Sequence, residues 1–290
     1  MTATTPSIPQ TTERLQPSLV WVIALKEIRE AVRSKWFWMW TVAFASLAAF
    51  MASVALPGSQ VTGYGSFGRT AASLVALAQI IVPLMGLTLG AYSIAGQRET
   101  GALRFLLSHP VSRSEAFCGT YLGLAISLAG TVFGGFGIAG VITVAQGGGA
   151  NAASFVRIAV LSWLLAVSML GFGMLVSTFT RRSSAALGTA IFLWLGFAFL
   201  GDLGVMGTAV ATRVPTWGLL ASAVLNPVEA FRLASLSAFS GSLDVLGPAG
   251  SFAVDTFGDR LGLLLFLNVV IWAGVPTVAA WARFTHGGDV

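Results

Sequence analysis

Long apolar runs separated by short polar stretches set the pattern of this chain. A helix needs roughly 20 apolar residues to cross the hydrocarbon core of a bilayer, and six runs are long enough. They lie at about 36–56, 71–95, 112–144, 155–179, 185–204 and 261–281. The pattern predicts an all-α integral membrane protein with six transmembrane helices. We expect one domain over residues 18–290, after a flexible N-terminus at 1–17.

A helix of a different kind is predicted before the first span, at 18–35. Trp21, Leu25, Ile28 and Val32 recur at i, i+4, i+7 and i+11, and charged residues occupy much of the rest of the wheel. A basic amphipathic helix beside a span is expected to lie along the cytoplasmic headgroups. The alternative is a solvated extension of the first span.

The stretch 205–260 is too polar to be a further span, and prolines interrupt it repeatedly. It holds Asp244, Asp255 and Asp259 together with Pro215, Pro227 and Pro248. We expect a partly helical extracytoplasmic segment between the fifth and sixth spans.

Composition agrees with this pattern, because hydrophobic residues make up 56% of the chain and charged residues 9%, with a mean hydropathy of +0.83. Such a balance excludes a soluble globular domain. The first eighteen residues lack an apolar run ending in small residues, so the first span is expected to act as the insertion signal. The single Cys118 excludes internal disulfides and clusters of cysteine ligands.

The basic residues are distributed unequally between the two sides of a six-span arrangement. Of the 16 Lys and Arg residues, five fall on the outer side and the other eleven on the side of the N-terminus. The five are Arg69, Arg157, Arg213, Arg232 and Arg260. The positive-inside rule therefore predicts that both termini and the connection at 96–111 are cytoplasmic. Topology accounts for the net charge of +5, so no nucleic-acid partner is expected.

The connection at 96–111 carries the densest charge between two spans. Leu103, Leu106 and Leu107 lie at i, i+3 and i+4, which predicts a short helix with one apolar face that Pro110 ends. An apolar stripe outside the bilayer needs a surface to pack on. That surface is either a docking groove on a soluble ATPase or the cytoplasmic ends of the protein's own spans.

The third span has a recognisable start. Ser112 and Glu115 match the S-x-x-E capping box, in which each residue binds the backbone amide of the other. The helix is therefore expected to begin directly after the connection.

Taken together, the basic helix, the first span and the sequence ETGALRFLLSHPVSR between spans two and three resemble the permease subunits of ABC-2 type transporters. In that family a segment E-x-G-(T/A)-L-x-x-L-L-(S/T)-x-P-(V/L)-(S/G)-R forms the coupling helix that sits on the nucleotide-binding subunit. The family often continues with a Gly-Lys pair, whereas Thr120 follows Gly119 here. The resemblance implies an ATPase-docking role for Glu99, Gly101, Leu103, Arg104, Leu106, Leu107, Ser108, Pro110, Ser112 and Arg113.

The same resemblance implies the assembly. It consists of a homodimer of this chain with two copies of an ABC ATPase subunit, in a prokaryotic cytoplasmic membrane. ATP and Mg²⁺ are expected on the partner ATPase, and no cofactor on this chain. Consistently, a phosphate-binding P-loop needs G-x-x-x-x-G-K-(S/T), and the only lysines, Lys26 and Lys35, lack those glycines.

A second motif narrows the resemblance. The sequence LNPVEAFRL in the outer segment is similar to the L-N-P-x-(D/E)-x-(F/Y)-R-L stretch of the NosY-type permeases of nitrous oxide reductase maturation. Asn226 is suited to cap a helix with Pro227 in its first position, and Glu229 and Arg232 would pair at i, i+3. An extracytoplasmic gate or a contact with a periplasmic repeat protein is expected at Asn226, Pro227, Glu229, Phe231 and Arg232.

Three polar residues at membrane depth, Gln79, Thr88 and Asn268, are candidates for a translocation path. The alternative for Gln79 and Asn268 is an interhelical hydrogen bond that fixes packing. No metal site is expected, because the only histidines, His109 and His286, are both predicted to be cytoplasmic and soft ligands do not converge elsewhere.

The function expected from these features is that of the permease subunit of an ATP-driven transporter. Under the NosY-type resemblance, the cargo is a sulfur-containing species for the copper-sulfur cluster of nitrous oxide reductase. A lipid, drug or polysaccharide exporter is the alternative within the family. A secondary transporter would need a charged ion-coupling residue in a span, and a non-transporting membrane scaffold would leave the leucine stripe unexplained.

Overall fold

The computed structural model describes residues 17–54, 64–145, 152–210, 224–237 and 256–287. The predicted N-terminus up to residue 16, the end of the first span at 55–56 and the parts of the outer segment at 211–223 and 238–255 lie outside these ranges. Every regular element in the described ranges is helical, which confirms the predicted all-α class.

The helical elements whose bounds lie within the described ranges follow in chain order. They are α1 (Pro17–Arg33), α2 (Lys35–Val54), α3 (Tyr64–Glu99), α4 (Ala102–Leu107), α5 (Arg113–Ala145), α6 (Ala152–Phe179), α7 (Ser183–Val210), α9 (Pro227–Ser237), the short 3-10 turn η3 (Gly258–Arg260) and α11 (Leu261–His286).

Five of the described helices, α2, α3, α5, α6 and α11, are long and apolar enough to cross a bilayer. α7 supplies a shorter apolar stretch, Ser183–Phe199, before it continues to Val210, so a sixth span stays a prediction. Several boundaries differ from those expected, because α3 begins at Tyr64 and continues to Glu99, α7 passes residue 204, and α11 continues to His286. A hydropathy pattern marks where apolar surface stops, whereas a helix can continue into water as long as its backbone hydrogen bonds are made.

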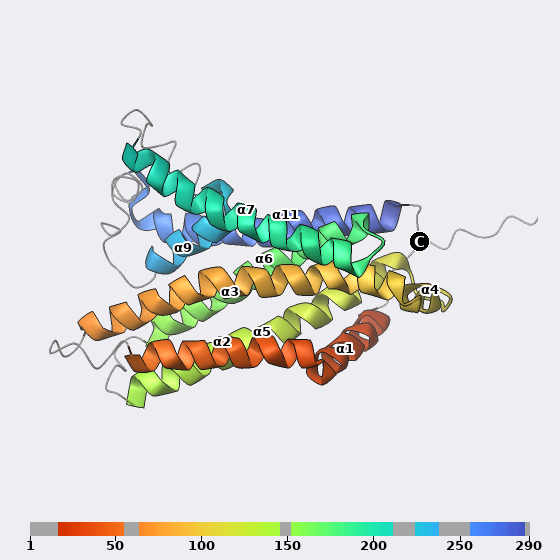
Figure 1. Ribbon diagram of the computed structural model, residues 1–290, viewed down its shortest axis with the longest axis horizontal. Helices are drawn as coiled ribbons and strands as arrows, with labels where there is room; N and C mark the ends of the chain where they lie inside the picture. The colour runs from red at the N-terminus through yellow and green to blue at the C-terminus, as the bar shows by residue number, and fades with distance from the viewer. Residues whose placement is uncertain (1–16, 55–63, 146–151, 211–223, 238–255, 288–290) are drawn as a thin grey trace, which may run out of the picture.

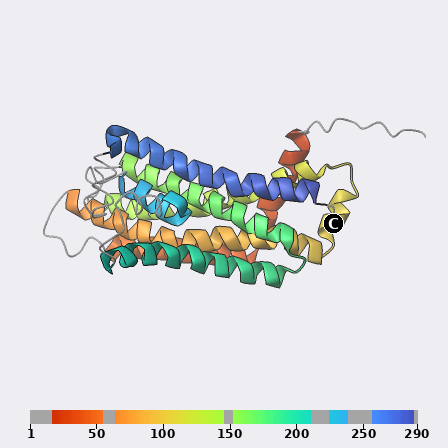
Figure 2. The same ribbon diagram turned by 90° about the horizontal axis from the view of Figure 1, so that it is seen from above.

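The centre of the bundle is the pair α3 and α6, with α2 and α5 on one side and α7 and α11 on the other (Figures 1 and 2). Glycines let the two central helices approach closely. A methyl group added to Gly90 would overlap the Leu170 carbonyl oxygen of α6, and one added to Gly173 would overlap the Leu87 carbonyl oxygen of α3. The Gly86 and Gly90 pair thus serves intramolecular packing, as a small-residue motif commonly does.

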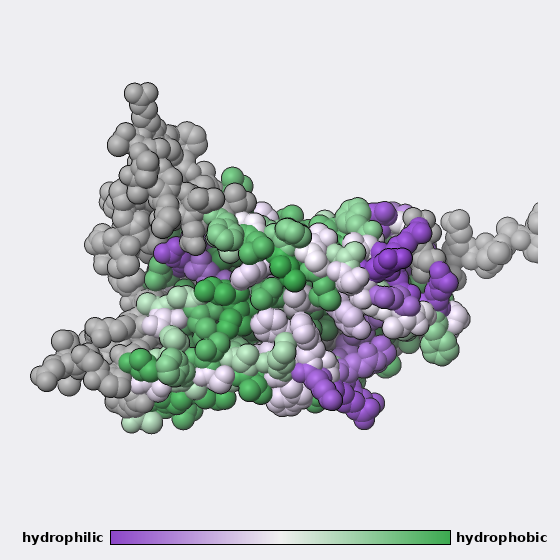
Figure 3. Space-filling view, in the orientation of Figure 1, coloured by the Kyte–Doolittle hydropathy of each residue, from purple (hydrophilic) through white to green (hydrophobic). Residues whose placement is uncertain are grey.

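The bundle has two chemically different ends. α1, α4 and the end of α11 lie at one end, and α9 lies at the other (Figure 1). Hydrophilic residues gather at the α1 and α4 end, whereas apolar residues cover the middle of the visible face (Figure 3). The predicted separation of the charged connection from the LNPVEAFRL motif is therefore present, and the assignment of the α4 end to the cytoplasm stays a prediction.

α1 lies against the start of α5 as an element separate from the first span, since Ser34 interrupts the two helices. Its face with Ile23, Ala24 and Ala31 is buried there. Trp21, Leu25 and Val32, from the predicted apolar face, are exposed on the outside of the bundle. That arrangement suits a helix that lies in the headgroup layer, which stays a prediction.

Candidate functional site

The turn between α3 and α4 depends on one glycine. Gly101 has φ 76° and ψ −1°, in the left-handed region that residues with a Cβ atom avoid. Its N–H donates to the Arg98 carbonyl oxygen over 3.2 Å, so the end of α3 and the turn are continuous. Gly101 thereby sets the direction in which the six residues of α4 leave the bundle.

The leucines of α4 face inward to different degrees. Leu103 is 2% exposed, and Leu107 is partly buried against the hydrophobic core. For these two side chains the leucine stripe packs on the protein's own spans, the second of the two alternatives considered above. Leu106 is half-buried. The face of α4 that points away from the bundle is therefore not the leucine face.

The large apolar side chain that α4 presents outward is Phe105, which is 72% exposed. Its ring lies edge-on to His109, with the ring centroids 4.9 Å apart, and Arg104, Ser108 and Pro110 around it are exposed as well. Phe105 was missed from the sequence because leucines surround it. The spacing nevertheless predicts its exposure. Phe105 is two residues after Leu103, and residues two apart on a helix lie on different faces.

Immediately before the turn, the last three residues of α3 each bond to a different helix. The Gln97 Nε2 atom donates to the Glu27 carboxylate on α1 over 3.0 Å. Arg98 donates to the carbonyl oxygens of Thr178 and Thr180, at 3.1 and 3.2 Å, at the C-terminal end of α6. The Glu99 carboxylate accepts the backbone and hydroxyl hydrogens of Ser183 at the start of α7.

These bonds follow the electrostatics of helix ends. A cationic group beside the free carbonyls of a C-terminus and an anionic group beside the free amides of an N-terminus are both favourable. Arg98 places a cation at the C-terminus of α6, and the adjacent Glu99 places an anion at the N-terminus of α7. Glu99, predicted to dock the ATPase, is exposed but already bonded to Ser183.

The far side of α4 is fixed to α5. The Ser112 N–H donates to the Glu115 carboxylate over 2.9 Å, and the Glu115 N–H donates to the Ser112 hydroxyl over 3.2 Å, so the predicted capping box is confirmed. Arg113 donates to the Gly287 carbonyl oxygen at the end of α11. The residues that flank α4 on its two sides thus bond directly to α1, α6, α7 and the end of α11.

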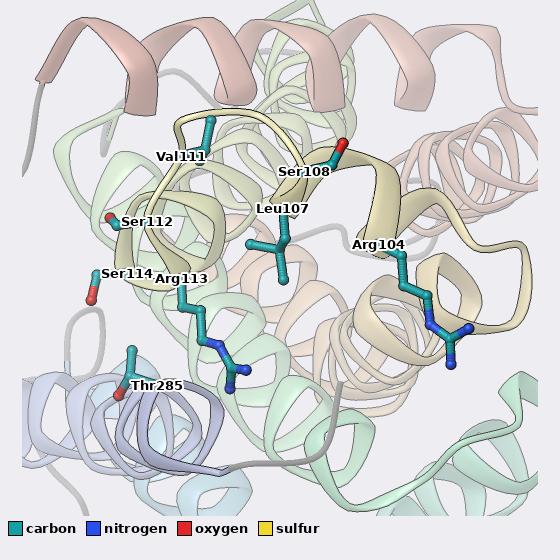
Figure 4. A pocket seen from close by; sticks show the side chains of 8 residues that line it. All are labelled: Arg104, Leu107, Ser108, Val111, Ser112, Arg113, Ser114 and Thr285. Atoms are coloured by element: carbon teal, nitrogen blue, oxygen red, sulfur yellow. The ribbon is translucent and has the colours of Figure 1, made fainter. Parts of the chain in front are cut away.

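A cavity of about 660 Å³ lies beside α4 (Figure 4). In Figure 4 the side chains of Arg104 and Arg113 extend in the same direction from the α4 and α5 hairpin, with Leu107 between them. The lining residues are Arg104, Leu107, Ser108, Val111, Ser112, Arg113, Ser114 and Thr285.

Glu27 is a buried carboxylate on α1, only 7% exposed. Burial raises its pKa above the ordinary value, and the ion pair with Lys26, at 3.3 Å, offsets this only in part. The pKa of Lys26 is in turn raised, because attraction to Glu27 and Glu30 outweighs the lowering by its own burial.

At the opposite end, the first turn of α9 is built as expected. The Asn226 side-chain oxygen accepts the Val228 N–H over 3.0 Å, which confirms the predicted cap before Pro227. The predicted pair of Glu229 and Arg232 is also present, with 3.5 Å between Oε2 and Nη1. The Asn226 amide in addition donates to the Phe197 carbonyl oxygen of α7 over 2.8 Å.

Most residues of this motif, for which a gate or a contact with a periplasmic partner is predicted, are buried within the bundle. Asn226 is 8% exposed, Glu229 6% and Phe231 0%, and Pro227 is buried too, which leaves only Arg232 half-exposed. The segment was expected outside because it is polar, but its polar groups find partners inside the bundle. A gate role for the motif stays a prediction.

Two of the three candidate path residues bond to this segment or to the residue just before it. The Gln79 amide of α3 donates to Glu229 over 3.2 Å, and the Asn268 amide of α11 donates to the Val224 carbonyl oxygen just before α9 over 3.2 Å. The alternative of an interhelical hydrogen bond is therefore confirmed for both. The Thr88 hydroxyl bonds to the Leu84 carbonyl oxygen of its own helix over 2.8 Å.

These features define a helical membrane permease with a clamped polar hairpin between its second and third apolar helices. The chain belongs to the ABC-2 transporter family, because the model for ABC-2 family transporter proteins matches residues 21–287. In ABC transporters of this kind the permease forms the membrane part, and partner subunits hydrolyse ATP.

Two relatives are similar over nearly their whole length. A protein of Stutzerimonas stutzeri named as a probable ABC transporter permease protein NosY is 31% identical over 278 residues, which covers 91% of this chain and 97% of the relative. The protein of the same name from Pseudomonas aeruginosa is 30% identical over 276 residues, covering 92% and 98%. The chain is therefore a NosY-like permease.

Proposed function

We propose that this chain is the permease subunit of an ATP-driven transporter whose partner ATPase docks on α4. Two copies of the chain form the translocation path, and each copy binds one ATPase subunit. Closure of the ATPase pair on ATP moves α4, and the movement passes into the membrane helices.

The observation that supports this proposal is the set of bonds made by the last three residues of α3. Gln97, Arg98 and Glu99 join α3 to α1, α6 and α7 within one turn of α4. Protein interiors are densely packed, so a displacement at a clamped point is transmitted rather than absorbed. A displacement of α4 would therefore move α3 together with α1, α6 and α7. This coupling is expected of a segment that transmits motion and not of a passive loop.

The rival classes explain the site less well. A secondary transporter needs no partner on α4, and a membrane scaffold needs no set of bonds that joins a protruding hairpin to α1, α6, α7 and α11. Phe105 offers a further argument, because a 72% exposed ring at the polar end of the molecule is an anchor suited to a protein surface.

The docking role is tested with Phe105→Asp in the full chain, reconstituted in lipid nanodiscs with its ATPase. We expect the affinity for the ATPase to fall tenfold or more. The substitution removes the aromatic anchor and places a negative charge against the ATPase surface that contacts it. Trp21→Ala is the matched control, since it removes a 53% exposed ring from α1 at the same end. Unchanged binding of Phe105→Asp would reject docking on α4.

The cargo that we propose is a sulfur-containing species for assembly of a copper-sulfur cluster, delivered outward toward a periplasmic partner. Similarity to two proteins named NosY supports this choice over a lipid, drug or polysaccharide. Vesicles that contain the permease and its ATPase test it with candidate sulfur compounds. ATP-dependent movement of such a compound is expected, whereas ATP-independent uptake would favour a secondary transporter.

A further inference from the structure

The cavity beside α4 is basic and hydroxyl-rich. Two guanidinium groups, Arg104 and Arg113, and four hydroxyls line it, and none of the residues around it carries a carboxylate. Among the residues that the structure describes, neither arginine has a carboxylate within ion-pair distance. Arg113 donates one of its five N–H groups to the Gly287 carbonyl oxygen. Within the described ranges, the cavity therefore holds two positive charges and no carboxylate paired with either of them.

The preference of the cavity for an anion comes from its two arginines. Arg113 and Ser114 begin α5 with Ser112 as the cap, and the Glu115 carboxylate already occupies the positive end of this helix by accepting the Ser112 N–H. Two arginines near such a helix end form charge-assisted hydrogen bonds, for which a planar carboxylate is a well-matched acceptor. The volume of 660 Å³ is large enough for a short segment of another protein that carries a carboxylate side chain.

The position of the cavity indicates where the anion comes from. Arg104 lines it and is adjacent to Phe105, the 72% exposed ring that we assign to ATPase docking. A protein that covers Phe105 would therefore lie next to Arg104. An aromatic anchor beside paired arginines is the combination that dominates the energetics of many protein interfaces.

We propose that a glutamate or aspartate side chain of the docked ATPase enters this cavity and pairs with Arg104 and Arg113. This inference rests on the proposed docking of the ATPase on α4 and adds the chemistry by which the partner is held. Phe105 supplies the apolar contact, and the arginine pair supplies a charge contact that a partner without the acidic residue cannot make.

The experiment is zero-length crosslinking of the full chain carrying Arg104→Lys, assembled with its ATPase in nanodiscs. A carbodiimide activates a carboxyl group, and an amine then displaces the urea by-product and forms an amide. The reaction therefore joins only a lysine and a carboxylate in contact. The chain has two lysines of its own, Lys26 and Lys35, so the background is small.

We expect an amide between position 104 and one acidic residue of the ATPase, identified by mass spectrometry of the linked peptides. Arg29→Lys on α1 is the matched control, because Arg29 is exposed at the same end of the bundle and does not line the cavity. In parallel, Arg104→Glu should weaken ATPase binding tenfold or more, whereas Arg104→Lys should stay within about threefold of the wild type.

Three outcomes are decisive. A complex that forms with Arg104→Lys but gives no amide at position 104, or binding that Arg104→Glu leaves unchanged, overturns the carboxylate contact and leaves docking on α4 intact. An amide to phosphatidylserine of the nanodisc in place of the ATPase shows a lipid in the cavity and overturns it as well. Failure of the wild-type chain to bind the ATPase at all refutes the proposed function itself.

Discussion

α4 and α9 are both short helices outside the long apolar spans, yet the protein uses them in opposite ways. α4 has six residues, of which only Leu103 is buried, and its outer face presents Arg104 and Phe105. α9 has eleven residues, of which eight are buried, and its polar groups bond to α3 and α7 through Glu229 and the preceding Asn226. One helix protrudes from the end of the bundle, and the other braces its interior.

The comparison of α9 with α4 shows that a motif rich in polar residues is not necessarily exposed. Asn226 and Glu229 are polar and buried because each has a partner in another helix, which removes most of the cost of burial. Phe105 is apolar and exposed, although a large ring is usually drawn inside. Of the two regions, α4 therefore has the properties of a docking site.

The largest expected effect comes from the same substitution made in both regions. Phe231→Ala should destabilise the protein by about 3–5 kcal/mol, because the ring is fully buried and its loss leaves a cavity. Phe105→Ala should change stability by less than about 0.5 kcal/mol, because its ring makes few contacts. Thermal unfolding in detergent measures both, and equal losses would remove the distinction between the two helices.

A second comparison removes one polar side chain from each region. Asn226→Ala should cost about 1–2 kcal/mol, since it deletes the helix cap and the bond to Phe197. Ser108→Ala should be nearly neutral, because the Ser108 hydroxyl is exposed and bonds only to the Phe105 carbonyl oxygen nearby. The same unfolding measurement applies, and a neutral Asn226→Ala would mean that α9 does not brace the bundle.

The direction of α4 can be altered without a steric clash. A Cβ atom at Gly101 has open space, but at a φ of 76° it adds about 1–2 kcal/mol of backbone strain. If that strain is relieved by reorienting α4, Gly101→Ala should weaken ATPase binding about 5- to 30-fold. Gly274→Ala adds a methyl group to an exposed helical glycine on α11 and serves as the control. Full affinity for Gly101→Ala would show that the direction of α4 is unimportant.

The smallest effect concerns the pH dependence set by Glu27. Because burial raises its pKa, folded Glu27 holds its proton to higher pH than the unfolded chain does. Stability is therefore lost as pH rises from the ordinary pKa of a glutamate through the raised value in the folded protein. Glu27→Gln should flatten the pH dependence of the unfolding temperature at pH values just above the ordinary pKa of a glutamate.

Glu30→Gln is the control for that prediction. Glu30 pairs with the same Lys26 at 3.1 Å but is exposed, and surface ion pairs contribute little to stability. Equal pH profiles for the two variants would mean that the buried position of Glu27 has no energetic consequence.

Much of the α4 region could be predicted from the sequence because local rules determine it. The capping box of Ser112 and Glu115, the short helix and its glycine turn all depend on neighbours within a few residues. The same holds for the Asn226 cap and the Glu229 and Arg232 pair. Spacing along one chain segment is enough to specify such features.

The rest depends on contacts between distant segments, which spacing does not encode. The burial of the LNPVEAFRL motif was not predicted, because Gln79, 150 residues away from Glu229, could not be recognised as its partner. The clamp of Arg98 on α6 and of Glu99 on α7 joins residues about 80 positions apart. Such bonds depend on which helices pack together, and that packing is a property of the three-dimensional structure.

Hydrogen–deuterium exchange of the chain in nanodiscs, with and without its ATPase, tests the central claim most directly because it probes both short helices at once. If the ATPase docks on α4, it slows exchange of the backbone amides of Ala102–Leu107 and leaves exchange of those of Pro227–Ser237 unchanged. Slower exchange in Pro227–Ser237 without any change in Ala102–Leu107 would contradict it.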